Sequence, residues 1–172
     1  MLEEQVLDPT VHDRERFDCG VPALNEYLQR YAEQHRCKGI SAAYVLVDSA
    51  AVSTVSGYYT LSAAEVDVAQ LAEADRRRLP RHPVPRFRKG RLACRVEQRG
   101  RGLGELLVGC AVDRRLKARQ QVAALALLVD AISETARRFH EHFGFRRLMD
   151  RDLTMYLPLG RRCSAALPAS AS

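Results

Sequence analysis

The feature that most constrains this sequence is a glycine-rich stretch between a predicted strand and a predicted helix. Residues 96–112 read VEQRGRGLGELLVGCAV, with three glycines in five positions and apolar residues at helical spacing directly after them. Backbone N–H groups at a helix N-terminus have no intrahelical partner, and glycines let an anion approach them closely. The stretch therefore predicts a strand–loop–helix unit whose loop binds an anion such as phosphate.

Hydrophobic periodicity predicts a mixed α/β (α+β) domain whose central sheet is flanked by helices. The apolar run at 122–130 predicts a strand that is buried on both faces of that sheet. Further strands are predicted at 42–48, 52–62, 90–96 and, as one or two strands, within 145–159; helices are predicted at 21–36, 67–78, 103–119 and 133–143. The proline-rich residues 80–86 predict a loop, because proline lacks a backbone donor. We expect one domain over residues 1–160 and a disordered tail over 161–172.

Composition indicates the compartment. No apolar run reaches the ~18 residues that a membrane span needs. The acidic N-terminus lacks the apolar core of a signal peptide. The five cysteines include no C-x-x-C pair, which predicts reduced thiols and no metal site. We therefore expect a cytoplasmic protein without a metal ion.

Positive charge is concentrated in residues 76–101. The formal net charge is +6, and this segment holds eleven Lys or Arg and one Glu, against sixteen basic and twenty acidic residues elsewhere. Such a field attracts polyanions, either nucleic acid or a phosphorylated cofactor. A solvated, arginine-rich surface is the alternative interpretation. The candidate phosphate-binding side chains are Arg76, Arg77, Arg78, Arg86, Arg88, Lys89, Arg91 and Arg95, of which the last two share a face by the strand period.

The spacing of the glycines distinguishes between phosphate-binding motifs. A Walker loop ends in Gly-Lys-Ser/Thr, which does not occur here, and the dinucleotide fingerprint needs Gly or Ala where Glu105 or Leu107 stands. Residues 99–104, RGRGLG, fit the form Gln/Arg-x-x-Gly-x-Gly/Ala. With GRLACRV before it and ARRFHEHFGF after it, this loop resembles the acyl-CoA loop of the GNAT superfamily of N-acyltransferases.

The resemblance implies the GNAT fold and acetyl-CoA as the co-substrate. It implies that the pyrophosphate is bound by Arg99, Gly100, Arg101, Gly102, Leu103 and Gly104. It further implies that the backbone of Leu92, Ala93 and Cys94 pairs with the pantetheine arm, and that Phe139 and Phe143 border the cofactor.

Five stretches resemble a narrower family, the GNAT toxins of bacterial toxin–antitoxin pairs. They span about residues 14–158 and read FDCGVPALNEYLQRYAEQH, VSGYYTLS, LPRHPVPRFRKGRLA, RGRGLGELL and ARRFHEHFGF. The resemblance implies acetylation of the α-amino group of aminoacyl-tRNA, a ribbon–helix–helix antitoxin and a homodimer. The basic segment fits it, because tRNA binding needs Lys and Arg to neutralise phosphates. The alternatives are an acceptor that is a small amine or a protein N-terminus, and a catalytically weak module that binds acyl-CoA or RNA.

His140 and Arg95 depart from the family pattern. His140 stands where the family has a tyrosine, in A-x-x-F-Y-x-x-F-G-F, and Arg95 stands where it often has an aspartate. The resemblance implies that His140 protonates the leaving thiolate, which an imidazole can do near neutral pH. The alternative is a histidine packed on an apolar helix face. Tyr58 and Tyr59 are consecutive in a strand, so one is expected to point inward and one outward. One of them lines an acceptor cleft, or both only follow the strand preference of aromatic residues.

Overall fold

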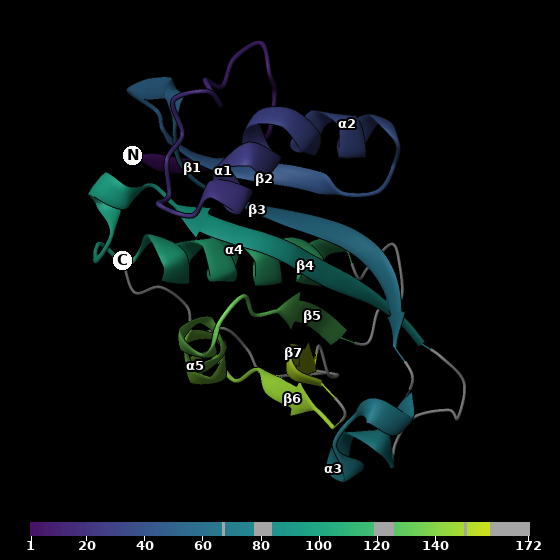
Figure 1. The fold of residues 1–172 in the computed structure, drawn as a ribbon. Coiled ribbons are helices and arrows are strands. Elements are labelled where there is room, and N and C mark those ends of the chain that lie inside the picture. The colour runs from purple at the N-terminus through teal and green to yellow at the C-terminus, as the bar shows by residue number, and fades with distance from the viewer. Residues whose placement is uncertain (67, 78–83, 119–125, 150, 159–172) are drawn as a thin grey trace, which may run out of the picture.

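The computed structural model describes residues 1–66, 68–77, 84–118, 126–149 and 151–158, with side chains except at 64–66, 68 and 84–89. Its strands are β1 (Leu2–Val6), β2 (Ala42–Asp48), β3 (Ala51–Val66), β4 (Val84–Cys94), β5 (Ala126–Asp130), β6 (Arg146–Leu148) and β7 (Arg151–Pro158). They form one sheet in the order β1-β2-β3-β4-β5-β7-β6 (Figure 1). The pair β4–β5 is parallel and the other neighbouring pairs are antiparallel.

Helices cover both faces of this sheet. On one face, α1 (Pro22–Glu26), a π-helical turn (Tyr27–Tyr31) and α2 (Ala32–Cys37) follow one another and pack on β2 and β3. On the other face lie α4 (Leu103–Ala118) and α5 (Glu134–His142). The short α3 (Glu73–Arg76) follows a 3-10 turn (Val68–Gln70) near β6 and β7 (Figure 1). The predicted mixed sheet between helices is confirmed.

Tyr58 and Tyr59 show how completely the sheet is covered. Consecutive strand residues point to opposite faces, so Tyr58 packs under α1 and Tyr59 packs under α4. Both side chains are 0% exposed. The expectation that one of them points outward is wrong, because a helix covers each face at this point. Neither ring borders an open cleft.

Several element boundaries differ from the predicted ones. β1 was not predicted, and the predicted helix at 67–78 is wrong apart from α3 and the preceding 3-10 turn. This segment is held instead by Leu71, which is 1% exposed, and by a hydrogen bond from the Ala72 amide to the Tyr156 hydroxyl of β7. The predicted loop at 80–86 is wrong from Val84 onward, where β4 already begins. Proline tolerates an extended backbone, and the pairing of β4 with β5 that the structure describes begins at Phe87, after Pro85.

A bulge in β4 shapes the centre of the sheet. Leu61 pairs with Lys89 and Tyr59 pairs with Leu92, so β4 has one extra residue between these pairs. The described pairing of β4 with β5 ends at the same place, at Lys89 and Val129. Beyond the bulge, β4 continues to Cys94 beside β3 while β5 ends at Asp130. The two parallel strands therefore diverge toward their C-terminal ends.

Some predictions concern residues outside the described part of the chain. These are the disordered tail at 161–172 and Arg78; for Arg86, Arg88 and Lys89 only the backbone is described. Within the described ranges, no helix has both the length and the apolar character needed to cross a membrane.

Candidate active site

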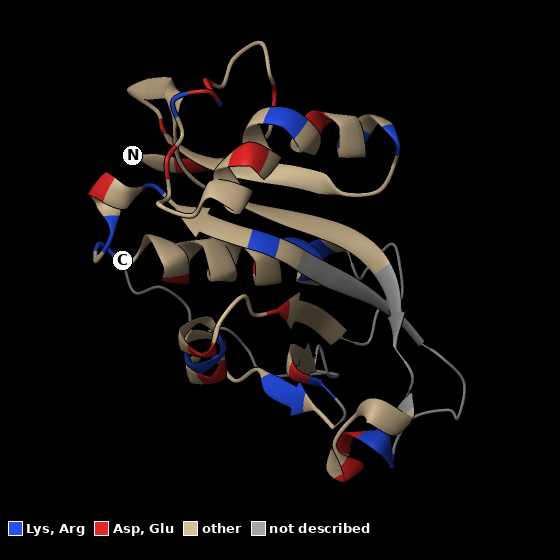
Figure 2. Cartoon of the chain, in the orientation of Figure 1, with Lys and Arg blue, Asp and Glu red and all other residues tan. Residues whose placement is uncertain are grey.

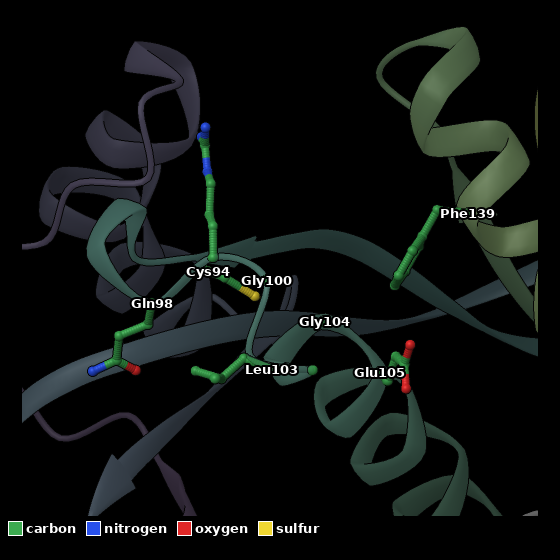
Figure 3. A pocket seen from close by; sticks show the side chains of 9 residues that line it. Cys94, Gln98, Gly100, Leu103, Gly104, Glu105 and Phe139 are labelled. Carbon is green, nitrogen blue, oxygen red and sulfur yellow. The ribbon is translucent and has the colours of Figure 1, made fainter.

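A cavity of about 300 Å³ lies where the predicted anion-binding loop meets α5. Its lining comes from the end of β4, the loop, the first turn of α4 and one side chain of α5: Cys94, Gln98, Arg99, Gly100, Gly102, Leu103, Gly104, Glu105 and Phe139. Phe139 reaches from α5 toward the start of α4, across from Cys94 (Figure 3). The structure thus gathers most of the predicted cofactor-binding residues around one space. It adds Gln98 and Glu105, which flank the motif and were not predicted.

Two glycines give the loop its shape. Gly100 and Gly102 each have a φ of +75°, a conformation that favours glycine. A Cβ added at either residue would meet no described atom within 4 Å, so the backbone faces open space. Directly after them, the first N–H groups of α4 carry partial positive charge. The loop is therefore suited to hold a phosphate group.

Gly104 lets α5 approach α4 closely. A Cβ at Gly104 would lie 3.2 Å from Cζ of Phe139. Phe139 in turn packs edge-to-face on Phe143, with ring centroids 5.0 Å apart. Phe139 therefore borders the cavity directly, whereas Phe143 supports it from behind.

The charged side chains of the loop have different orientations. Arg99 donates a hydrogen bond to the backbone carbonyl of Cys19, so its guanidinium is anchored on the turn before α1. Arg101 is exposed on the loop, outside the cavity lining. Glu105 lines the cavity and places a carboxylate in the first turn of α4. Of the two arginines of the loop, Arg99 therefore lines the cavity with one of its donors held by Cys19, whereas Arg101 lies outside the lining.

The end of β4 presents backbone groups to the side from which β5 has diverged. The amide of Arg91 bonds to Thr60 Oγ1 and that of Arg95 to the carbonyl of Ser56, so these amides face β3. Because strand residues alternate, the backbone of Leu92 and of Cys94 faces the opposite side. The geometry thus favours Leu92 and Cys94 as partners of an extended arm. Ala93 does not fit that role, since its backbone faces β3.

His140 lies beside the cavity without lining it. Its side chain is 5% exposed, and the rings of Phe139 and Phe145 lie edge-on to it with centroids 5.3 Å away. Nδ1 is 2.7 Å from the carbonyl oxygen of Ala136, which can only accept, so Nδ1 carries a hydrogen.

Arg91 in β4 and Arg95, the residue that follows β4, point to the same side of the sheet, as predicted, but differ in their surroundings. The Arg91 side chain is half-buried, and its guanidinium carbon lies 3.7 Å from the ring centroid of Tyr27. Arg95 is 13% exposed; its Nε donates to the carbonyl of Val55 at 2.9 Å and its Nη1 to that of Arg16 at 3.0 Å. Arg95 therefore holds the backbone together, which does not fit its predicted role in RNA binding.

Basic side chains stand without acidic ones on β4, whereas the charge on α3 and α5 is mixed. The described part of β4 carries blue and no red in Figure 2, whereas α5 and α3 carry both colours. On α3, Arg77 pairs with Glu73 at 2.6 Å. On α5, the buried Arg137 pairs with Glu134 and, at 2.6 Å, with Glu141.

A partly buried polar cluster between β1, β3 and α4 was not predicted. Tyr59 and Arg114 both donate to the carboxylate of Glu4, and Arg114 also lies 4.1 Å from the ring centroid of Tyr44. Burial, followed by the bond to Glu4, raises the pKa of Tyr59 above its usual range, so its phenol stays protonated. The cluster joins β1 to α4 and positions the helix that carries the loop. Its members lie far apart in the sequence.

Comparison with known proteins gives relatives over most of the chain. No protein-family model matches the sequence. The chain is 34% identical over 129 residues, 75% of either protein, to a Mycobacterium tuberculosis protein named tRNA-acetylating toxin. Among solved structures, AtaT complexed with acetyl-methionyl-tRNAfMet superposes with a TM-score of 0.84 and 31% identity, covering 92% of this chain and 95% of AtaT. A tyrosine-to-phenylalanine mutant of the AtaT toxin, bound to the C-terminus of the antitoxin AtaR and acetyl-CoA, gives 0.78 and 29%, covering 91% and 92%.

The fold, the glycine loop and the diverging strands define a GNAT-type N-acetyltransferase. Within this class, the chain belongs to the family of tRNA-acetylating toxins, the GNAT toxins of toxin–antitoxin pairs.

Proposed function

We propose that this protein transfers the acetyl group of acetyl-CoA to the α-amino group of aminoacyl-tRNA, and that it is a toxin that blocks translation. The observation that carries the proposal is the cavity at the glycine loop, placed where β4 and β5 diverge. The loop accepts the pyrophosphate, and the backbone of Leu92 and Cys94 pairs with the pantetheine arm. This arrangement holds the thioester between the two strands.

The reaction needs an amine that has lost one proton. The amine nitrogen attacks the thioester carbonyl carbon and the C–N bond forms. The C–S bond then breaks to release the CoA thiolate; the nitrogen loses one proton as it becomes the amide nitrogen, and the thiolate takes up one proton. The ester of an aminoacyl-tRNA withdraws charge and lowers the pKa of its amine, so much of the amine is neutral near pH 7. Positioning and backbone donors therefore supply most of the catalysis.

His140 is the proton donor to the thiolate in this proposal. It follows Phe139, which borders the cavity, and its Nδ1 is fixed by the carbonyl of Ala136. Nε2 is then the nitrogen that delivers the proton, from the imidazolium form in which both ring nitrogens carry a hydrogen. We expect His140→Phe to lower acetyl transfer about 10²–10⁴-fold with little change in acetyl-CoA affinity, and His140→Tyr to retain activity. Full activity of the Phe variant would instead make His140 a packing residue.

The partners follow from charge and family. We infer that Arg91 contacts phosphates of the tRNA, together with Arg86, Arg88 and Lys89 on the same strand. A ribbon–helix–helix antitoxin that competes for this surface, a homodimer and a cytoplasmic location complete the proposal. An acceptor tRNA also explains the basic segment, which a small amine leaves without a role.

The test is transfer of labelled acetyl from acetyl-CoA to total charged tRNA, compared with the same tRNA after mild deacylation. Label on charged tRNA alone is the expected result. Label on neither, with acetyl-CoA binding intact, would contradict the proposal and favour another amine. Added salt should also slow the reaction steeply, because phosphate contacts release counterions.

A further inference from the structure

Asp130 is the last residue of β5, at the point where β4 and β5 diverge. The described pairing of β4 with β5 stops one residue before it, at Val129. On its other side Asp130 pairs with Thr154 of β7, whose hydroxyl donates to Asp130 Oδ1 at 2.8 Å. Thr154 is 8% exposed and Asp130 is half-buried. A carboxylate is thus held in a fixed orientation where the two parallel strands part.

The strand period places this carboxylate on the face opposite the cavity. Leu127 and Val129 pack on the side of α4 and α5, where the cavity lies. Leu128 packs on the other side with Leu71 and Tyr156, and Asp130 shares its face. Arg91 lies on that face too, against Tyr27.

An acyl donor bound in the cavity therefore reaches the diverging strands from one face of the sheet. The other face carries a half-buried arginine from β4 and a carboxylate at the end of β5. An aminoacyl-tRNA brings two charged groups to such a site: phosphates, which an arginine attracts, and an α-ammonium, which a carboxylate attracts. The arginine and the carboxylate at this face are therefore complementary in charge to those two groups.

We propose that Asp130, oriented by Thr154, binds the α-ammonium group of the arriving acceptor amino acid on the face opposite the acyl-CoA cavity, and that the amine attacks the thioester after this group has lost one proton. This inference rests on the proposed function and adds to it the residue that recognises the reacting end of the substrate. The sequence pattern did not single it out, because Asp130 reads as the polar end of an apolar strand.

The test compares the binding of aminoacyl-tRNA with that of its α-hydroxyacyl analogue, which nitrous acid produces from the same charged tRNA. CoA replaces acetyl-CoA so that no transfer occurs. We expect the wild type to bind the amine form about tenfold more tightly, and Asp130→Asn to bind both forms alike. Thr154→Val should lose part of the preference, and Thr154→Ser, which keeps the hydroxyl, should restore it.

Asp152→Asn is the matched control, since Asp152 is an exposed aspartate two residues from Thr154 on β7. It should keep the wild-type preference. A tenfold preference that persists in Asp130→Asn would overturn the inference, and so would the absence of any preference in the wild type. In either case the proposed function is retained if the protein still transfers acetyl to charged tRNA. Absence of that transfer would remove the proposed function itself. If Asp130→Asn fails to fold, the comparison of Thr154→Val with Thr154→Ser tests the inference: equal preference for the amine form in both variants would overturn it.

Discussion

The hydroxyl of Thr60 accepts a hydrogen bond from the backbone amide of Arg91 at 2.9 Å, at the bulge where β4 turns away from β5. A bulge leaves an amide without its partner in the ladder, and a buried amide needs another acceptor. Gly90 makes room for this contact, because a Cβ there would lie 2.6 Å from Thr60 Oγ1. A buried threonine of β3 thus supports the geometry of the acyl-CoA site.

Thr60→Val tests this role of the bulge. The variant keeps the side-chain shape and removes the acceptor, so we expect unfolding free energy to fall by about 1–3 kcal/mol. Acetyl-CoA affinity should fall about tenfold or more, because β4 is no longer held in its bent course. Urea unfolding and calorimetry measure the two effects. Thr60→Ser keeps the hydroxyl and should bind like the wild type; equal binding by the valine variant would show that the bulge forms without this bond.

Gly102→Ala should impair the loop and leave the rest of the fold in place. A left-handed φ costs a residue with a Cβ about 1–2 kcal/mol, and the methyl group would occupy the space where a phosphate approaches. We expect acetyl-CoA binding to weaken at least tenfold by calorimetry. Gly109→Ala, on an exposed position of α4, is the control: it should stabilise the protein by up to about 1 kcal/mol and leave binding unchanged.

Glu105→Gln should change stability and cofactor affinity in opposite directions. An acidic side chain in the first turn favours the helix by about 0.3–1 kcal/mol, so the variant should unfold slightly more easily. Removing a carboxylate from the cavity lining should tighten acetyl-CoA binding by a few-fold. The gain should shrink in high salt. Weaker binding at every salt concentration would mean that Glu105 contacts the cofactor favourably.

Arg91→Gln and Arg95→Gln should separate an RNA contact from a structural contact. If Arg91 binds a tRNA phosphate, its variant should reduce the slope of log affinity against log salt by about one. Arg95 donates to two backbone carbonyls, so its variant should lower thermal stability and leave that slope unchanged. Filter binding over a salt series, together with thermal unfolding, measures both. An unchanged slope for Arg91→Gln would remove this residue from the tRNA surface.

His12 should make the fold sensitive to mild acid. It is 3% exposed; its Nδ1 accepts the amide of Asp8 at 2.9 Å, and its Nε2 lies 3.1 Å from Gln5 Oε1. Burial lowers the pKa of His12 below its ordinary value of 6.5. Stability from the neutral ring is therefore present above pH 6.5 and is lost as pH falls toward the lower folded-state pKa.

The urea midpoint should accordingly drop between about pH 7.5 and about pH 5, and His12→Asn should flatten that drop. His142→Gln removes an exposed histidine and should leave the pH dependence as it is. An equally steep loss of stability in His12→Asn would assign the acid sensitivity to other groups.

Local patterns predicted the elements whose causes are local. α5 was predicted within a residue or two, because Ser133 caps it and Gly144, with a φ of +84°, follows its end. The strand at 42–48 and the helix after the glycine loop were also predicted, because the spacing of their apolar residues is a local pattern. The helix predicted at 67–78 is wrong beyond α3 and the 3-10 turn, because that segment is held by contacts with β6 and β7 that no local pattern records.

By itself, the sequence determined the glycine loop and the helix that follows it, since these depend on residues next to one another in the chain, and it indicated the class of protein through the resemblance of several such stretches to a known family. Only the tertiary structure decided that Tyr58 and Tyr59 are both buried, that Arg95 bonds inward, and that Thr60 closes the bulge under Gly90. It also decided that Asp130 faces away from the cavity. Each of these outcomes depends on which strand or helix lies opposite a side chain, and that is settled by the packing of segments far apart in the sequence.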